Sequence, residues 1–125
     1  MLLSIVLMLA CQVAETTDAK TCALHTPTLV PSSAMPGEQI VVTTQPLTET
    51  WDTAVTVGSA RAELVTIDRS TCEDCEACDT PCDTCVQTLT FVVPELGAGE
   101  WPVEIVNRHG RSERVSLTVV AAPVP

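Results

Sequence analysis

The chain has 125 residues and a formal net charge of −10, from sixteen acidic against six basic side chains. With so few basic residues it has no stripe to neutralise phosphates, which excludes proteins that bind nucleic acid or anionic lipid through a basic surface. The length suits one domain, and with only 2% aromatic residues its core must be built from aliphatic side chains.

Residues 2–10 form an apolar run, with Ser4 its one polar residue, that leads to Cys11. A helix of that length is too short to cross the ~30 Å hydrocarbon core of a bilayer, but it matches the apolar part of a secretory signal. The sequence Met8-Leu9-Ala10-Cys11 resembles the lipobox of bacterial lipoproteins. This resemblance implies that residues 1–10 are a signal peptide and that Cys11 is lipidated. An ordinary first helix with a buried Cys11 is the alternative.

Residues 11–22 are polar and show no helical periodicity, so they are expected to be a tether between an acylated Cys11 and the domain. Several acyl chains on one cysteine give a stable membrane anchor. The lipoprotein resemblance therefore places the protein in the cell envelope, at the outer membrane or on a periplasmic or extracellular face.

From residue 23 onward the composition changes to Val, Thr and Ile interrupted by Pro and Gly, which is typical of strands and turns. Residues 40–44 are expected to form a strand after the turn at 36–38, and residues 54–57 a strand that ends at Gly58. A further strand is expected over residues 61–67, with Ala62, Ile67 and either Leu64 or Val65 facing inward.

Residues 70–86 form a cysteine-rich acidic loop with five cysteines and five carboxylates: Cys72, Cys75, Cys78, Cys82, Cys85, Glu73, Asp74, Glu76, Asp79 and Asp83. In an exported chain such a cluster favours disulfides. If Cys11 is lipidated, Cys22 brings the remaining cysteines to six, enough for three bridges in any of 15 pairings. Cys22 is expected to join the start of the domain to this loop.

Metal sites are the alternatives for the same cysteines. Cys72, Cys75, Cys82 and Cys85 form two C-x2-C pairs of the kind that bind zinc, although the pairs are closer than usual. The first four cysteines match a ferredoxin iron–sulfur spacing, but the following proline is replaced by Asp83. The carboxylates lack the order of a known calcium loop, so a solvated acidic loop is favoured. The disulfide interpretation implies no cofactor.

After the loop, apolar and polar residues alternate through three segments, as expected for half-buried strands. The inward positions are expected to be Leu89, Phe91 and Val93, then Trp101, Val103 and Ile105, then Val115, Leu117 and Val119. Pro94 ends the first of these segments, and residues 107–110 turn the chain before the last. Together the segments predict an all-β sandwich.

Three blocks resemble an IPT/TIG domain, an immunoglobulin-like module of cell-surface receptors, some transcription factors and exported bacterial proteins. They are residues 36–42, residues 55–60 and, most specifically, residues 91–112, which follow the pattern of strand, proline, glycine turn, strand and Asn-x-x-Gly. The resemblance implies an immunoglobulin-like β-sandwich over residues 23–121, interrupted by the cysteine-rich loop and followed by a tail at 122–125.

No catalytic motif is present, and His25 and His109 are expected to be surface residues without a catalytic partner. A redox C-x-x-C centre would normally open a helix, and none is predicted. The interpretation is a non-catalytic, lipid-anchored envelope protein that displays its domain to a protein or polysaccharide partner. Trp51, the loop at 72–85 and the turn at 108–111 are the candidate contacts, with Trp51 equally suited to the core. A metal-binding or redox module is the alternative.

Overall fold

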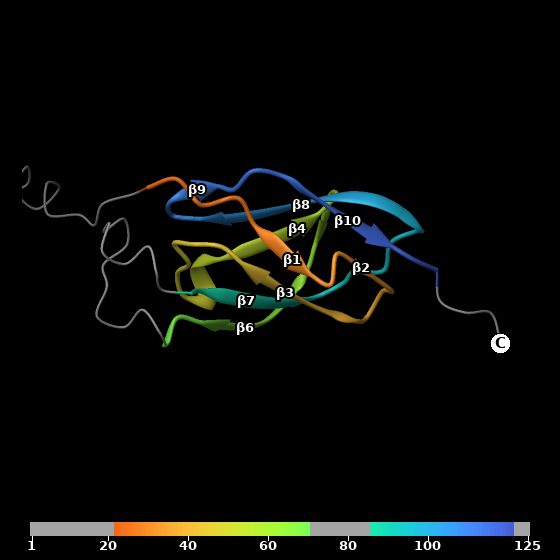
Figure 1. The fold of residues 1–125 in the computed structure, drawn as a ribbon, viewed down its shortest axis with the longest axis horizontal. Helices are drawn as coiled ribbons and strands as arrows, with labels where there is room; N and C mark the ends of the chain where they lie inside the picture. The colour runs from red at the N-terminus through yellow and green to blue at the C-terminus, as the bar shows by residue number, and fades with distance from the viewer. Residues whose placement is uncertain (1–21, 71–85, 122–125) are drawn as a thin grey trace, which may run out of the picture.

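The computed structural model describes residues 22–70 and 86–121, which fold as two β-sheets that face each other (Figure 1). The one helical element within these residues is a single 3-10 turn, η1 (Thr50–Asp52). The prediction of an all-β sandwich is confirmed.

Each sheet is built from short strands that are distant in the sequence. The first, which we call sheet A, has the order β1 (Thr28–Val30), β3 (Gln39–Thr43), β7 (Thr88–Val92), β6 (Glu63–Asp68). The second, sheet B, has the order β2 (Ser33–Ala34), β10 (Val115–Val119), β8 (Gly99–Asn107), β4 (Ala54–Val57), β5 (Ala60–Arg61), with β9 (Gly110–Arg111) also paired to β8.

This strand order is that of an immunoglobulin-like sandwich, in which the first, second, fifth and fourth strands form one sheet and the third, sixth and seventh form the other. The opening segment is divided between the sheets. β1 pairs antiparallel with β3 in sheet A, whereas β2 runs parallel to β10 in sheet B. The first strand therefore closes one edge of both sheets.

The core lies between the sheets and is aliphatic apart from Phe91, as the composition requires. Except at a bulge in β6, alternate residues of the strands face inward, so the buried positions follow the period of two seen in the sequence. The inward positions predicted for β7, β8 and β10 are confirmed, with Trp101 and Val115 partly buried at the margin. The largest side chains that are almost fully buried are Phe91, Ile40, Leu89, Ile105, Leu117, Val42, Val55, Val57, Val93, Val103 and Val119.

The single strand expected over residues 61–67 is wrong in one respect, because the chain changes sheets there. Arg61 ends β5 in sheet B, Ala62 is buried at the crossing, and β6 begins at Glu63 in sheet A. The pairing of β6 with β7 shifts between Leu64 and Thr66. This bulge brings Leu64 and Ile67 to the core and leaves Val65 46% exposed.

Several connections meet at one end of the sandwich, which we call the loop end. The register places Ala54 opposite Val106 in sheet B and Thr43 opposite Thr88 in sheet A. The connection at 44–53 and the turn at 107–110 therefore lie at this end. The described chain also begins there, beside β9 (Figure 1), and the connection between β6 and β7 leaves and returns there.

Candidate functional site

Six of the seven cysteines lie outside the residues that the structure describes. Cys11 and the five cluster residues Cys72, Cys75, Cys78, Cys82 and Cys85 lie outside the described residues. Cys22 is described and is disulfide-bonded. The connectivity of the six cysteines and the lipidation of Cys11 stay predictions.

Hydrogen bonds fasten the connections of the loop end to one another. The side-chain amide of Asn107 donates to the carbonyl of Pro46 at 3.1 Å, across 61 residues of sequence, and its Oδ1 accepts from the backbone N–H of His109 at 2.8 Å. The backbone N–H of Arg108 donates to Oδ2 of Asp52 at 3.3 Å. The turn at 107–110 and the connection at 44–53 are therefore held as one unit.

Trp51 stands on this unit and is 82% exposed, which resolves whether it belongs to the core or the surface. The turn beneath it is fixed from inside: the buried hydroxyls of Thr48 and Thr53 lie 3.0 Å apart, and Thr53 Oγ1 also donates to the carbonyl of Glu49 at 2.9 Å. The N–H of Asp52 donates to the same carbonyl. The indole is thus presented on an ordered turn.

His109 is half-buried, not the surface residue that the sequence suggested. Its Nδ1 accepts a hydrogen bond of 3.3 Å from the backbone N–H of Cys22, so the proton of the neutral ring is on Nε2. Nε2 is buried and has no hydrogen-bond partner among residues 22–70 and 86–121. Burial lowers the pKa of His109, the charge of Arg108 lowers it further, and Asp52 opposes both. The ring is therefore held in its neutral form.

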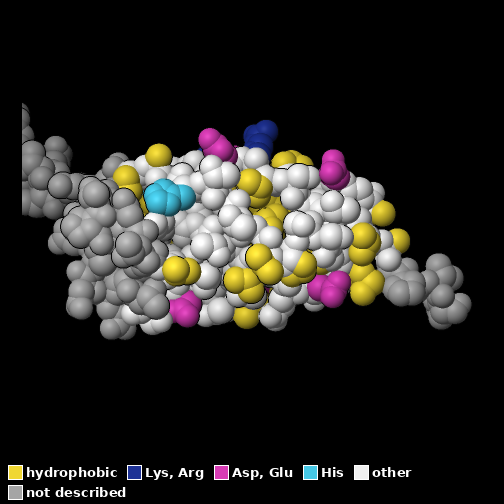
Figure 2. All heavy atoms as spheres, in the orientation of Figure 1, with side chains coloured by type: hydrophobic (Ala, Val, Ile, Leu, Met, Phe, Trp, Pro, Cys, Tyr) yellow, Lys and Arg dark blue, Asp and Glu magenta, His cyan; other side chains and the backbone are white. Residues whose placement is uncertain are grey.

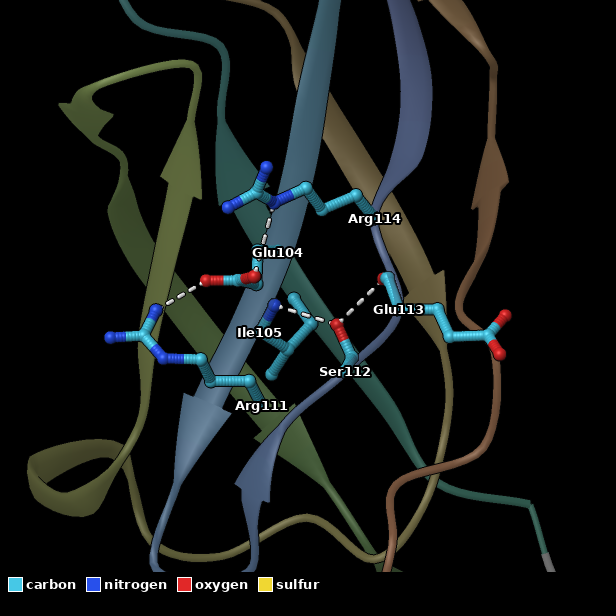
Figure 3. A network of polar contacts seen from close by, with 6 residues as sticks. All are labelled: Glu104, Ile105, Arg111, Ser112, Glu113 and Arg114. Atoms are coloured by element: carbon cyan, nitrogen blue, oxygen red, sulfur yellow. Dashed lines mark hydrogen bonds and ion pairs between the residues drawn. The ribbon is translucent and has the colours of Figure 1, made fainter.

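A second polar cluster lies on sheet B around Glu104, whose side chain is 11% exposed (Figure 3). Arg111 approaches one carboxylate oxygen at 2.5 Å and Arg114 the other at 3.4 Å, from opposite sides. The hydrogen bond from Arg111 is the main reason that the pKa of Glu104 is lowered. The two arginines pair a carboxylate that would be costly to bury alone.

Next to Glu104 in β8, a side chain supplies one of the hydrogen bonds of the backbone. Ser112 Oγ accepts from the backbone N–H of Ile105 at 2.9 Å and donates to the carbonyl of Glu113 (Figure 3). The carboxylate of Glu113 points away from Glu104 and accepts from Thr26 Oγ1. Every group in this cluster has a structural partner, so it stabilises the fold and offers no reactive side chain.

Other exposed apolar side chains do not form a comparable feature. Val30 and Val41 are neighbours on β1 and β3, 60% and 40% exposed, but their surroundings on the strands are mainly threonine. On the face drawn in Figure 2, hydrophobic side chains are scattered among uncharged ones, and acidic side chains lie towards the edges. Scattered surface apolar residues of this kind are ordinary.

Within residues 22–70 and 86–121, no group of three or more His, Cys, Asp or Glu side chains is placed to bind a metal. In the same part of the chain, no helix has the length and hydropathy needed to cross a bilayer. Of the features described, the loop end combines an exposed aromatic ring with ordered polar groups, and it is the candidate site.

The sequence identified two parts of this site, Trp51 and the turn at 108–111, as exposed candidates but gave no reason to join them. Asp52, which connects them, was missed, because its hydrogen bond to Arg108 spans 56 residues. The Glu104 cluster was also missed. Strand alternation marks Glu104 as outward-facing, and nothing in the sequence shows that two arginines cover it.

Comparison with known proteins leaves these assignments without outside support: no family model matches the chain, and neither does any curated protein.

Proposed function

We propose that the protein is a non-catalytic, lipid-anchored protein of the cell envelope. It displays one immunoglobulin-like domain of the IPT/TIG type to a protein or glycan partner. The observation that carries the proposal is Trp51, an indole 82% exposed on a turn that buried hydroxyls and the bond between Asp52 and Arg108 hold in place. Tryptophan is enriched among the residues that contribute most of the binding energy at protein interfaces.

The non-catalytic part of the proposal is supported by how the described polar groups are used. Glu104 is engaged by two arginines, and His109 faces a backbone N–H with its Nδ1. A general base needs an accessible lone pair near its substrate, and a nucleophile needs an adjacent base. Neither arrangement occurs among these described groups, at the loop end or around Glu104.

The anchoring part rests on the sequence. The apolar run before Cys11, followed by a polar tether, agrees with a domain that starts at residue 23 and carries its own core. A disulfide-bonded Cys22 agrees with an oxidising compartment. The remaining cysteines would form further bridges and stiffen the connection between β6 and β7.

Expression of the full chain in a bacterial host tests the anchor. The proposal expects mass spectrometry to find residues 1–10 removed and acyl chains on Cys11, and expects the variant Cys11→Ser to leave the membrane fraction. Cys22→Ser is the matched control and stays in the membrane. An unmodified Met1 on the membrane-bound product refutes anchoring, and reduced thiols with bound zinc or iron favour a metal module instead.

A further inference from the structure

Two adjacent residues of the loop end, Trp51 and Asp52, offer a ligand an aromatic ring and a carboxylate. Trp51 gives a flat apolar ring, and Asp52 gives a carboxylate of which Oδ2 accepts from Arg108 N–H, leaving Oδ1 without a hydrogen bond to any described residue. The guanidinium of Arg108 is exposed, and among the described residues no ion pair engages it. A planar acceptor next to Trp51 in the chain and a planar donor on the turn bonded to Asp52 thus belong to the same unit as the exposed ring.

The surroundings of Trp51 distinguish between partners. A tryptophan that anchors a protein interface is usually ringed by contacts that exclude water. The residues on either side of Trp51 are hydrophilic: Glu49 and Thr50 are exposed, Asp52 is half-exposed, and Glu49 pairs with Arg69 on the neighbouring strand end. The chain neighbours of the indole are not apolar, so a dry protein contact there would bury the charged groups of Glu49 and Asp52.

A sugar fits this combination better. A pyranose ring has an apolar face of C–H groups, which packs on an aromatic ring, and hydroxyls at its edge, which bond carboxylates and guanidinium groups in pairs. We propose that the loop end binds neutral hexopyranose chains, with one sugar stacked on Trp51 and its hydroxyls bonded by Asp52 and Arg108. This inference rests on the proposed display function and names the class of its partner.

The exposure of Trp51 also sets the strength of binding. A ring that stands above the surface contacts one face of one sugar, so most of the ligand stays in water. For about a dozen non-hydrogen atoms at ordinary ligand efficiency, the dissociation constant is on the order of 1 mM. Many anchored copies facing a repeating polymer would bind far more tightly than one copy. The site therefore suits a polysaccharide and not a free monosaccharide.

Titration of the full chain with cellohexaose, maltohexaose and chitohexaose tests the inference, followed by NMR of two signals that every variant retains, the backbone N–H groups of Asp52 and Arg108. At least one hexaose is expected to shift both signals with a dissociation constant on the order of 1 mM. Trp51→Ala is expected to weaken binding about tenfold or more, Trp51→Phe to retain part of it, and Val41→Ala, an exposed apolar control on β3, to leave it unchanged.

Failure of all three hexaoses to bind the folded chain overturns the glycan assignment. The display function has a separate readout, which is cross-linking on intact cells through Thr50, the exposed neighbour of Trp51. A protein captured there would support display while ruling out a sugar as the partner. Equal binding by Trp51→Ala and wild type also overturns the assignment, because the stacked ring is then not used.

Discussion

The indole of Trp101 packs directly against the Cα of Gly58, at the end of the sandwich opposite the loop end. Gly58 has a φ of +61°, and its N–H donates to the carbonyl of Pro102 at 2.8 Å. A Cβ built on Gly58 would lie 2.7 Å from Cε3 of Trp101. The indole is itself fixed, because its Nε1 donates to the carbonyl of Gly97. Position 58 thus requires glycine for two reasons, the backbone conformation and the approach of the ring.

The first prediction follows from this contact. Gly58→Ala is expected to lower the free energy of unfolding by about 2 kcal/mol or more, from the left-handed backbone and the displaced indole. Thermal unfolding measures the loss, at about 4–8 °C per kcal/mol for a domain of this size. Gly97→Ala is the control, since nothing lies within 4 Å of its added Cβ. Equal melting temperatures for the two variants would show that the ring does not constrain Gly58.

The second prediction concerns Glu104. Its pKa is lowered in the folded protein, so its contribution to stability is present above the unfolded pKa near 4.5 and is lost as pH falls through the folded value. The free energy of unfolding, measured with urea, is therefore expected to fall more steeply on acidification for wild type than for Glu104→Gln. Glu100→Gln, an exposed carboxylate on the same strand, is the control. A slope unchanged by Glu104→Gln contradicts the role of the arginines.

The third prediction concerns His109. Burial lowers its folded pKa, so the unfolded chain binds more protons as pH falls below about 6.5, and the fold loses stability in that direction. Protonation would also set a donor on Nδ1 against the N–H of Cys22. His109→Gln is expected to flatten the pH dependence of unfolding between about pH 7 and 5. His25→Gln removes the other, exposed imidazole as a control, and a persisting slope in His109→Gln argues against this account.

The fourth prediction concerns the bond that joins the two turns of the loop end. Asp52→Ala removes the acceptor of the Arg108 N–H, and we expect up to about tenfold faster hydrogen exchange at that amide, because such a bond contributes roughly 0.5–1.5 kcal/mol. Asp52→Asn keeps an oxygen in place and is expected to exchange more slowly than the alanine variant. Identical exchange in all three proteins would mean that the bond does not hold the turns together.

Local patterns were enough to predict the strands, because the inward positions recur with a period of two. Leu89 and Phe91, or Leu117 and Val119, can be identified without knowing what they face. The bulge at Leu64 and the change of sheet at Ala62 could not be predicted, since both depend on how β6 pairs with β7. The loop end is likewise a tertiary feature: Cys22 and His109 meet across 87 residues. Only the exposed indole and the turn near it had a sequence signal.

Photo-cross-linking on intact cells tests the central claim that the loop end is the contact surface. A benzophenone amino acid placed at Thr50, the exposed neighbour of Trp51, is compared with the same group at Glu95, an exposed position in the β7–β8 connection at the opposite end. Adducts of a protein or a glycan are expected from position 50 and none from position 95. Adducts from position 95 alone, or equal adducts from both, would contradict that claim.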